Sequence, residues 1–479
     1  MGEIMKSNTS RFFVGLGLLL YLILYSTSLD HSFFWDTIQL GSSHAHFFYE
    51  NNFSKILLPE PIDSGHIPLF GAYLALTWKF FGQTLLVSHL AMLPFVLGIG
   101  YQVIRLPQDY FGNQQWGIVS FLLLIDPTLM AQITMVSPDV LLIFFFLLSL
   151  RAILKNHKSW IIVGMLFLFL VSLRGIMIAF CLFLFDMYRN VDFRQNTQRI
   201  LEAMIRRGFL YVPATLLAGS YLFYHYDQRG WIGYHEDSVW YNCFQRVGFQ
   251  GFLRNIGIYF WRLWDFGRVG IWAIGIWLAI RNWSRWIGNK RLKPWVLLFF
   301  IFACVLPLNM LWANNLLGHR YLLPIYLCFS LLVAFLLFSS PLKPKIRRVL
   351  ILFWALILLS GNIWVYPRHI SQGWDSSLAY LPYNSLRKEA MAFLDDQNIP
   401  TTAVGSFFPN ISSMKWTDLS KTEDRFRSFS LENKPEYVFY SNVFNLSDVH
   451  RKELEKNYTE YKNFRSTSVI VIIFQRTSN

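Results

Sequence analysis

Residues 295–312 read Trp-Val-Leu-Leu-Phe-Phe-Ile-Phe-Ala-Cys-Val-Leu-Pro-Leu-Asn-Met-Leu-Trp, a run of eighteen residues without a charged side chain. Such a run approaches the roughly 20 residues that a helix needs to cross a lipid bilayer. Basic residues precede it, from Arg281 to Lys293. The stretch therefore predicts a membrane-spanning helix that begins next to a basic loop.

The composition of the whole chain agrees with this single run. Of its 479 residues, 54% are hydrophobic, 18% aromatic and only 15% charged. Charged residues make up about a quarter of an ordinary globular domain. The four cysteines show no metal-binding or disulfide spacing. We therefore expect a polytopic integral membrane protein.

The positive charge is concentrated beside the apolar runs. The formal net charge is +14, and nineteen of the 43 Lys and Arg residues fall in five short segments: 6–11, 151–158, 189–207, 281–293 and 343–348. Cytoplasmic loops of membrane proteins carry such an excess of basic residues. This placement indicates the bilayer, and not nucleic acid, as the partner of the positive charge.

The apolar runs predict about eleven spans, with the N-terminus in the cytoplasm. The expected spans are 12–28, 85–104, 116–134, 140–150, 160–173, 176–187, 209–224, 269–280, 295–312, 321–338 and 349–365. The segment 67–81 is short for a span. If it lies along the membrane or is half inserted, the four later basic loops all fall inside. If it crosses, the loop 151–158 falls outside, so we prefer the first path.

Two domains are expected, an all-α membrane domain over 1–365 with an external loop at 29–66, and an extracytoplasmic α/β domain over 366–479. The second domain is predicted from a helical pattern at 384–396, strand-like runs at 401–407, 436–440 and 466–475, and a helix capped by Ser447. The C-terminus then lies outside, and nothing indicates an organelle signal. The bacterial inner membrane, with a periplasmic site, is the expected location.

Ionisable residues at the ends of membrane spans are costly, so each is a candidate functional residue. Six of them fall at the external ends of the predicted spans: Asp36, His66, Asp139, Arg174, His319 and Arg320. A carboxylate can take a proton from an acceptor hydroxyl, and arginine binds phosphate through a planar fork of donors. The set fits glycosyl transfer from a sugar carried on a lipid phosphate.

The order of these residues along the chain resembles that of a known superfamily. The motifs are Gly65-His66-Ile67-Pro68-Leu69 with Phe81-Gly82 at the end of the next apolar segment, Pro138-Asp139, Arg174-Gly175 and Arg320 to Pro324. They resemble the GT-C superfamily of polyprenyl-phosphate-sugar glycosyltransferases, in particular the protein O-mannosyltransferase and lipid A aminoarabinose transferase branch. Ile67 departs from the family's first proline, and Thr37 departs from the frequent glutamate after the catalytic aspartate.

The resemblance implies a mannosyltransferase-like enzyme that moves a hexose or pentose with inversion of configuration. Asp36 would act as the general base and Asp139 as a second catalytic residue. The donor phosphate would be held by Arg174, Arg320, His319 and His66. The acceptor would be a protein, a lipid or a polysaccharide. No cofactor is expected; a divalent metal is possible, but His44, His46 and Glu50 in one loop are weak support.

Each of these residues also has a simpler interpretation. An aspartate in the first turn of a helix is favoured by the helix dipole, and an arginine at the end of a span can extend its side chain to the interface. The alternative function is a membrane transporter or lipid flippase, a class that often shows two related halves. The sequence contains no such internal repeat. A non-catalytic scaffold is the third alternative.

Overall fold

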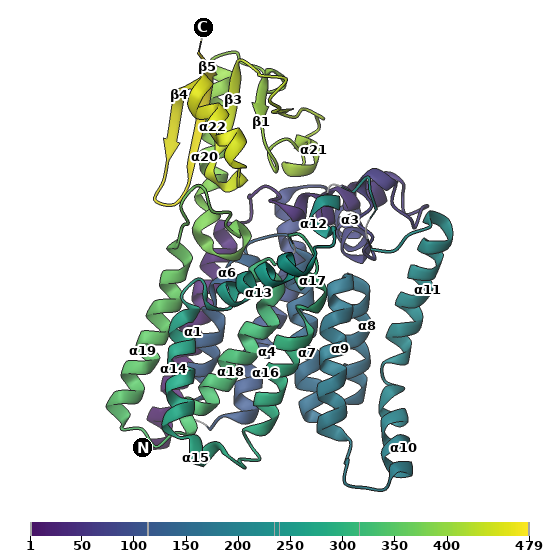
Figure 1. The fold of residues 1–479 in the computed structure, drawn as a ribbon, viewed down its shortest axis with the longest axis vertical. Coiled ribbons are helices and arrows are strands. Elements are labelled where there is room, and N and C mark those ends of the chain that lie inside the picture. The colour runs from purple at the N-terminus through teal and green to yellow at the C-terminus, as the bar shows by residue number, and fades with distance from the viewer. Residues whose placement is uncertain (1, 113–114, 234, 239, 316, 478–479) are drawn as a thin grey trace.

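The computed structural model describes residues 2–112, 115–233, 235–238, 240–315 and 317–477. Figure 1 shows a bundle of helices with a small sheet domain stacked on one end, here called the sheet end. The N-terminus lies at the opposite end of the bundle, here called the far end. The predicted fold class, a helical domain followed by a small C-terminal α/β domain, is confirmed.

The long helices of the bundle run between its two ends (Figure 1). In chain order they are α1 (Gly2–Thr27), α4 (Leu85–Tyr110), α7 (Pro138–Lys155), α8 (Lys158–Val171), α9 (Leu173–Asn190), α11 (Val212–Arg229), α14 (Arg268–Arg281), α16 (Lys293–Val305), α18 (Leu323–Ser339) and α19 (Pro344–Ser360). Their sequences are rich in Leu, Ile, Phe and Val, which a bilayer-facing helix needs. The shorter helix α5 (Trp116–Leu124) packs against α1 and α4.

By length and composition, five helical stretches of the described chain are able to cross a membrane. They are Thr9–Thr27, Leu85–Tyr110, Lys293–Leu311, His319–Ser339 and Pro344–Ile363. A sixth is added if α13 (Phe249–Trp264) and α14 count as one span, although they meet at a bend of 88°. The number of eleven spans stays a prediction.

Short helices cover the sheet end. They are η1 (Ile38–Ser43), α2 (His44–Glu50), η2 (Glu60–Ile62), α3 (Leu69–Phe81), α6 (Pro127–Gln132), α12 (Tyr241–Phe244), α13, α17 (Leu308–Leu311), η3 (His319–Leu322) and η4 (Gly361–Ile363). The helices α10 (Thr197–Gly208) and α15 (Trp283–Trp286) lie at the far end (Figure 1). Helix α13 runs across the bundle and lies between the predicted spans 209–224 and 269–280.

The segment 67–81, whose path was ambiguous in the sequence, lies at the sheet end as α3 (Figure 1). It packs along α2, because a Cβ on Gly71 would approach that of His44 to 2.3 Å. The Trp78 ring lies 5.1 Å from the His46 ring, which extends this contact along both helices. This position agrees with the path in which the segment does not cross the bundle.

The basic loops gather at the far end of the bundle. Asp109, near the end of α4, forms ion pairs with Arg151 (2.9 Å) and Lys155 (2.8 Å) at the end of α7. Asp186 in α9 pairs with Arg207 at 2.6 Å. Since cytoplasmic loops are enriched in basic residues, a cytoplasmic far end stays the prediction.

This orientation predicts the outcome of cysteine labelling in intact cells. Lys158→Cys at the far end should react with a membrane-impermeant maleimide only after permeabilisation, whereas Lys421→Cys in the sheet domain should react without it. Both lysines are exposed. The parent chain gives the background from Cys304, its exposed native cysteine. Labelling of Lys158→Cys in intact cells would show that the chain has the opposite orientation.

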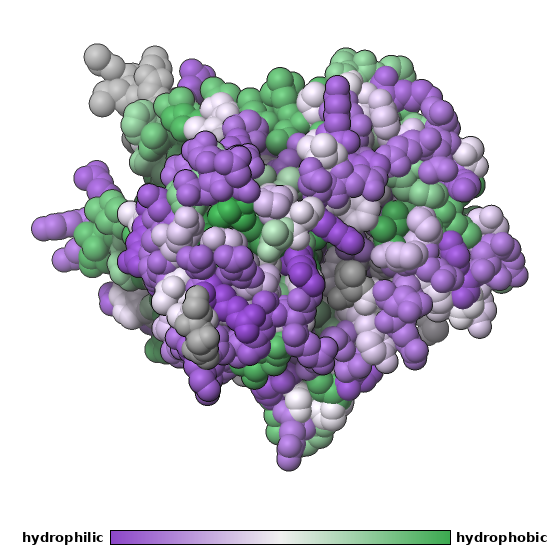
Figure 2. Space-filling model, turned by 90° about the horizontal axis from the view of Figure 1, so that it is seen from above, coloured by the Kyte–Doolittle hydropathy of each residue, from purple (hydrophilic) through white to green (hydrophobic). Residues whose placement is uncertain are grey.

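The sides of the bundle are apolar, and the sheet end is not. Exposed hydrophobic side chains include Leu22 on α1 (64%), Phe223 on α11 (73%), Phe300 on α16 (54%) and Leu352 on α19 (59%). Seen from the sheet end, the surface is largely hydrophilic (Figure 2). So much exposed apolar surface indicates contact with lipid.

The C-terminal domain contains a five-stranded sheet of order β2-β1-β3-β5-β4. Its elements are α20 (Pro382–Asp396), β1 (Val404–Ser406), α21 (Met414–Thr417), β2 (Arg427–Ser428), β3 (Tyr437–Ser441), α22 (Asp448–Asn457), β4 (Tyr458–Arg465) and β5 (Ile470–Arg476). The Ser447 hydroxyl accepts from the His450 amide and caps α22, as predicted. Strands β2 and β4 were not predicted. Strand β2 has two residues, and β4 has polar outward residues and, among the described strands, pairs with β5 alone.

The two domains share a hydrophobic core. Phe34 of the first external loop stacks on Tyr380, with ring centroids 4.9 Å apart, and also contacts Tyr383. Met135 is buried in the same cluster, and the hydroxyls of Thr134 and Tyr380 lie 2.8 Å apart. The sheet domain is therefore packed onto the bundle and not tethered by a free linker.

Candidate functional site

The four strongest candidate residues all lie at the sheet-end starts of helices. Asp36 precedes η1, and Asp139 lies in the first turn of α7, where the Ser137 hydroxyl accepts from its amide. Arg174 is in the first turn of α9, and Arg320 lies in η3, before α18. Because these helices begin at one end of the bundle, their first residues are brought to one region.

Arg320 is the centre of a cluster of three carboxylates. Its Nη2 donates to Asp36, and its Nη1 donates to Asp375. Its Nε lies 3.2 Å from Oδ2 of Asp139. Asp139 also accepts from Nη1 of Arg174. The structure thus brings Asp36, Asp139, Arg174 and Arg320 together, as the sequence predicted.

Aromatic residues enclose this cluster. The Tyr321 ring lies 3.9 Å from the Arg174 guanidinium and 4.9 Å from that of Arg320. Its hydroxyl accepts from Nη2 of Arg320 at 3.0 Å. The indole Nε1 of Trp240 lies 3.4 Å from Oδ1 of Asp36. Ring faces stabilise the guanidinium groups and fix their planes toward the carboxylates.

The cluster holds one carboxylate more than its two arginines can neutralise. Burial raises the pKa of Asp375, although the Arg320 guanidinium lowers it. Of the three carboxylates, Asp36 has the most exposed side chain, at 19%, against 15% for Asp375 and 6% for Asp139. Asp36 is therefore the carboxylate that a ligand from the surface reaches most directly.

His66 lies next to the cluster without joining it. Its Nδ1 accepts from the Leu173 amide at 3.4 Å, directly before Arg174. Burial first, and then the charge of Arg174, lower the pKa of His66 to about 4. At neutral pH the side chain is an uncharged imidazole, so any contact with a phosphate would be a hydrogen bond and not an ion pair.

His319 points away from the cluster. Its side chain is fully buried, and its Nε2 lies 2.7 Å from Oδ2 of Asp265. Nη1 of Arg262 is 3.4 Å from the same nitrogen, and a Cβ on Gly373 would touch Nδ1 of His319 at 2.9 Å. The structure therefore places His319 in a separate contact with α13 and does not bring it to Arg320.

Asp375 is the member of the cluster that the sequence analysis missed. It lies in η5 (Trp374–Ser376), between α19 and the sheet domain. The segment Gly-Trp-Asp-Ser-Ser carries no motif, and its partner Arg320 is 55 positions earlier in the chain. The available signal was an acidic residue shortly after the last apolar run.

A second buried ion pair was also missed. Asp126 accepts from Nη2 of Arg268 at 2.7 Å and from its Nε at 3.0 Å. Asp126 also caps α6, which corrects the span expected at 116–134: α5 ends at Leu124 and a new helix begins at Pro127. An acid inside an apolar run is a signal in itself.

No metal centre is evident in the part of the chain that the structure describes. There, no group of three or more His, Cys, Asp or Glu side chains is arranged to hold a metal ion. Nε2 of His44 lies 2.8 Å from the Ile62 carbonyl, and Nδ1 of His46 lies 2.9 Å from the Ser42 carbonyl. Glu50 pairs with Lys415. Each of the three possible metal ligands in this loop therefore contacts a different protein group.

Comparisons with known proteins identify similar folds only among solved structures. No family model matches the sequence, and no curated protein matches it. One similar structure is ArnT from Cupriavidus metallidurans bound to undecaprenyl phosphate, with 12% identity over 96% of this chain and 97% of that chain, and a TM-score of 0.48. Another is the same protein in the apo state, with 13% identity over 97% and 98%, and a TM-score of 0.49. Such values assign neither family nor activity.

Proposed function

We propose that the chain is an integral membrane glycosyltransferase. It moves a hexose or pentose from a polyprenyl-phosphate donor to a protein, lipid or polysaccharide acceptor on the extracytoplasmic face, in the bacterial inner membrane. The observation that carries the proposal is the cluster of Asp36, Asp139 and Asp375 around Arg320, with Arg174 beside it. It lies where an apolar bundle meets a hydrophilic surface, which a donor with a lipid tail and a polar head requires.

The reaction follows from the position of Asp36. The acceptor hydroxyl gives its proton to a carboxylate oxygen of Asp36, and its oxygen attacks the anomeric carbon. The bond between that carbon and the phosphate oxygen breaks, and the polyprenyl phosphate leaves with the electron pair. Attack opposite the leaving group inverts the configuration. Arg320 holds Asp36 in place, and Asp139 orients both arginines.

Arg174 is the residue best placed to bind the donor phosphate. Among the described residues it spends one nitrogen, Nη1, on Asp139, so its other N–H groups are available to phosphate oxygens. Arg320 shares its charge among three carboxylates and would strengthen its phosphate contact as one of them moves aside. His66, neutral and adjacent to Arg174, adds a hydrogen bond.

The proposal predicts that the purified chain in nanodiscs cleaves polyprenyl-phosphate sugars. Undecaprenyl phosphate, the lipid bound in one ArnT structure, is a suitable carrier, loaded with a radiolabelled hexose or pentose. We expect release of undecaprenyl phosphate to depend on an added acceptor mixture. Asp448→Asn, at an exposed carboxylate of α22, serves as the matched control. Movement of labelled lipid across vesicle bilayers without cleavage would favour a flippase instead.

A further inference from the structure

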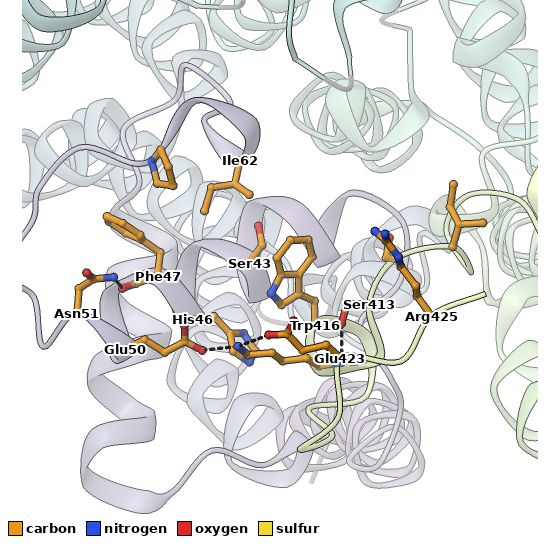
Figure 3. Close-up of a pocket in the computed structure, with 14 residues that line it drawn as sticks. Ser43, His46, Phe47, Glu50, Asn51, Ile62, Ser413, Trp416, Glu423 and Arg425 are labelled. Carbon is orange, nitrogen blue, oxygen red and sulfur yellow. Dashed lines mark hydrogen bonds and ion pairs between the residues drawn. The ribbon is translucent and has the colours of Figure 1, made fainter. Parts of the chain in front are cut away.

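A pocket separate from the reactive cluster lies between the first external loop and the sheet domain (Figure 3). Its volume is about 550 Å³, within the range of small-molecule sites. One wall comes from η1 and α2, and the other from α21 and the loop that follows it. The residues that line it include Ser43, Phe47, Glu50, Asn51, Lys415, Trp416, Glu423 and Arg425.

Among the residues that the structure describes, the charges of this pocket leave the Arg425 guanidinium without a partner. Lys415 bridges the two walls, because its Nζ lies 2.9 Å from Oε1 of Glu50 and 3.2 Å from Oε1 of Glu423. Arg425 is exposed, and within the described residues its side chain forms no hydrogen bond or ion pair. An unpaired guanidinium in a pocket offers a planar fork of donors to a carboxylate or phosphate.

The uncharged lining suits a ring with hydroxyl groups. The Trp416 indole lies in the middle of the pocket, with Ser43 beside it (Figure 3). In this view Phe47 and Asn51 lie to one side of the indole and Arg425 to the other. The apolar C–H face of a pyranose packs on a flat indole, while serine, asparagine and glutamate oxygens accept from its hydroxyls.

We propose that this pocket binds a saccharide with an anionic substituent, and that this saccharide belongs to the acceptor. The sugar ring lies against Trp416, and its negative group faces Arg425. The assignment as an acceptor site rests on the proposed glycosyltransferase function; the assignment as a saccharide site does not. The substituent is a carboxylate or a phosphate, because a guanidinium binds both in the same way.

The pocket is connected to the reactive cluster through one short segment. Asp36 lies two positions before η1, and Ser43, at the end of η1, lines the pocket. On the opposite wall, the Thr417 carbonyl accepts from the Phe33 amide at 2.8 Å. An acceptor held at Trp416 is therefore bound at the same domain junction as the proposed base.

Binding is tested on the full chain in nanodiscs by saturation-transfer NMR. The probes are glucuronate, glucose 6-phosphate, glucose and inorganic phosphate. We expect Arg425→Gln to weaken binding of the two anionic sugars about tenfold, the effect of losing a charged hydrogen bond, with little change for glucose. Arg427→Gln, an exposed arginine of β2 outside the pocket, should bind like the parent. Trp416→Ala should weaken all three sugars, and Trp416→Phe less.

The possible outcomes distinguish the saccharide site from the proposed glycosyltransferase function. Unchanged binding in both Arg425→Gln and Trp416→Ala overturns the proposal, as does inorganic phosphate that binds as tightly as glucose 6-phosphate. Displacement of glucuronate by a short acidic peptide, at lower concentration than by any sugar, would indicate a peptide site and also overturn it. If sugars bind as expected but no donor is cleaved, the saccharide site stands and the glycosyltransferase function fails. If transfer occurs and Arg425→Gln leaves the acceptor KM unchanged, the acceptor assignment fails alone.

Discussion

Asp36→Asn is expected to lower the turnover of sugar transfer by about 10²–10⁴-fold, the usual contribution of a general base. The amide keeps the shape of the side chain, and its single carbonyl oxygen can still accept from Arg320. The contact of Trp240 with the other oxygen of Asp36, at 3.4 Å, would be lost. The amide has almost no basicity, so the acceptor hydroxyl would lose its proton to water. The measurement is the initial rate of polyprenyl phosphate release at saturating donor and acceptor.

The loss must come from chemistry and not from unfolding. Thermal unfolding of Asp36→Asn should stay close to that of the parent, because the contact with Arg320 persists in neutral form. Asp448→Asn should show parental turnover. Near-normal turnover in a well-folded Asp36→Asn would remove Asp36 from the reaction, and Asp139 would become the leading base. If Asp139→Asn were equally active, a transporter would explain the chain better.

Arg320→Gln is expected to have the largest effect on stability, about 3–5 kcal/mol, as for other broken buried ion pairs. Arg320 is 6% exposed and is shared by three carboxylates. Without it, Arg174 is the one cation that remains among the described residues of the cluster, and of the three carboxylates it pairs with Asp139. The variant should unfold at a lower temperature in detergent, and its remaining folded fraction should show a raised KM for the donor.

A double substitution distinguishes charge from packing. Arg320→Gln with Asp375→Asn removes one uncompensated carboxylate and should recover part of the lost stability. Arg368→Gln, an exposed arginine near the same junction, should unfold like the parent. If Arg320→Gln unfolds at the parental temperature, the cluster does not stabilise the junction. If the double variant is less stable than Arg320→Gln, Asp375 contributes through packing instead.

The sequence contained the information for the path of the chain but not for all of its contacts. Alternation of apolar runs with basic loops predicted which residues share an end of the bundle, and this placed Asp36, Asp139, Arg174 and Arg320 together. A helix that crosses the bundle brings only its first or last residues to a given end, so the order of apolar runs and basic loops determines which residues meet. That order assigns residues to an end of the bundle, but the direction of each side chain depends on its packing.

The contacts that the sequence did not predict depend on the direction of side chains. His319 and Arg320 are neighbours in η3, yet Nε2 of His319 contacts Asp265 while Arg320 faces the carboxylates. Asp375 joins the site through the fold of a segment without periodicity. Strand β4 has exposed polar residues, and its partner β5 defines it. In each case the decisive contact is between residues far apart in the chain or on opposite sides of one turn.

The contact between Asp375 and Arg320 makes the two domains mutually dependent. Asp375 follows the last long helix of the bundle and precedes the sheet. The stacked rings of Phe34 and Tyr380 pack at the same junction. Loosening of the water-exposed sheet would therefore withdraw a ligand of the central arginine while the helices stay embedded in lipid. A mild denaturant that cannot dissolve the transmembrane bundle would then abolish activity at a concentration where far-ultraviolet circular dichroism still reports a nearly native helix content.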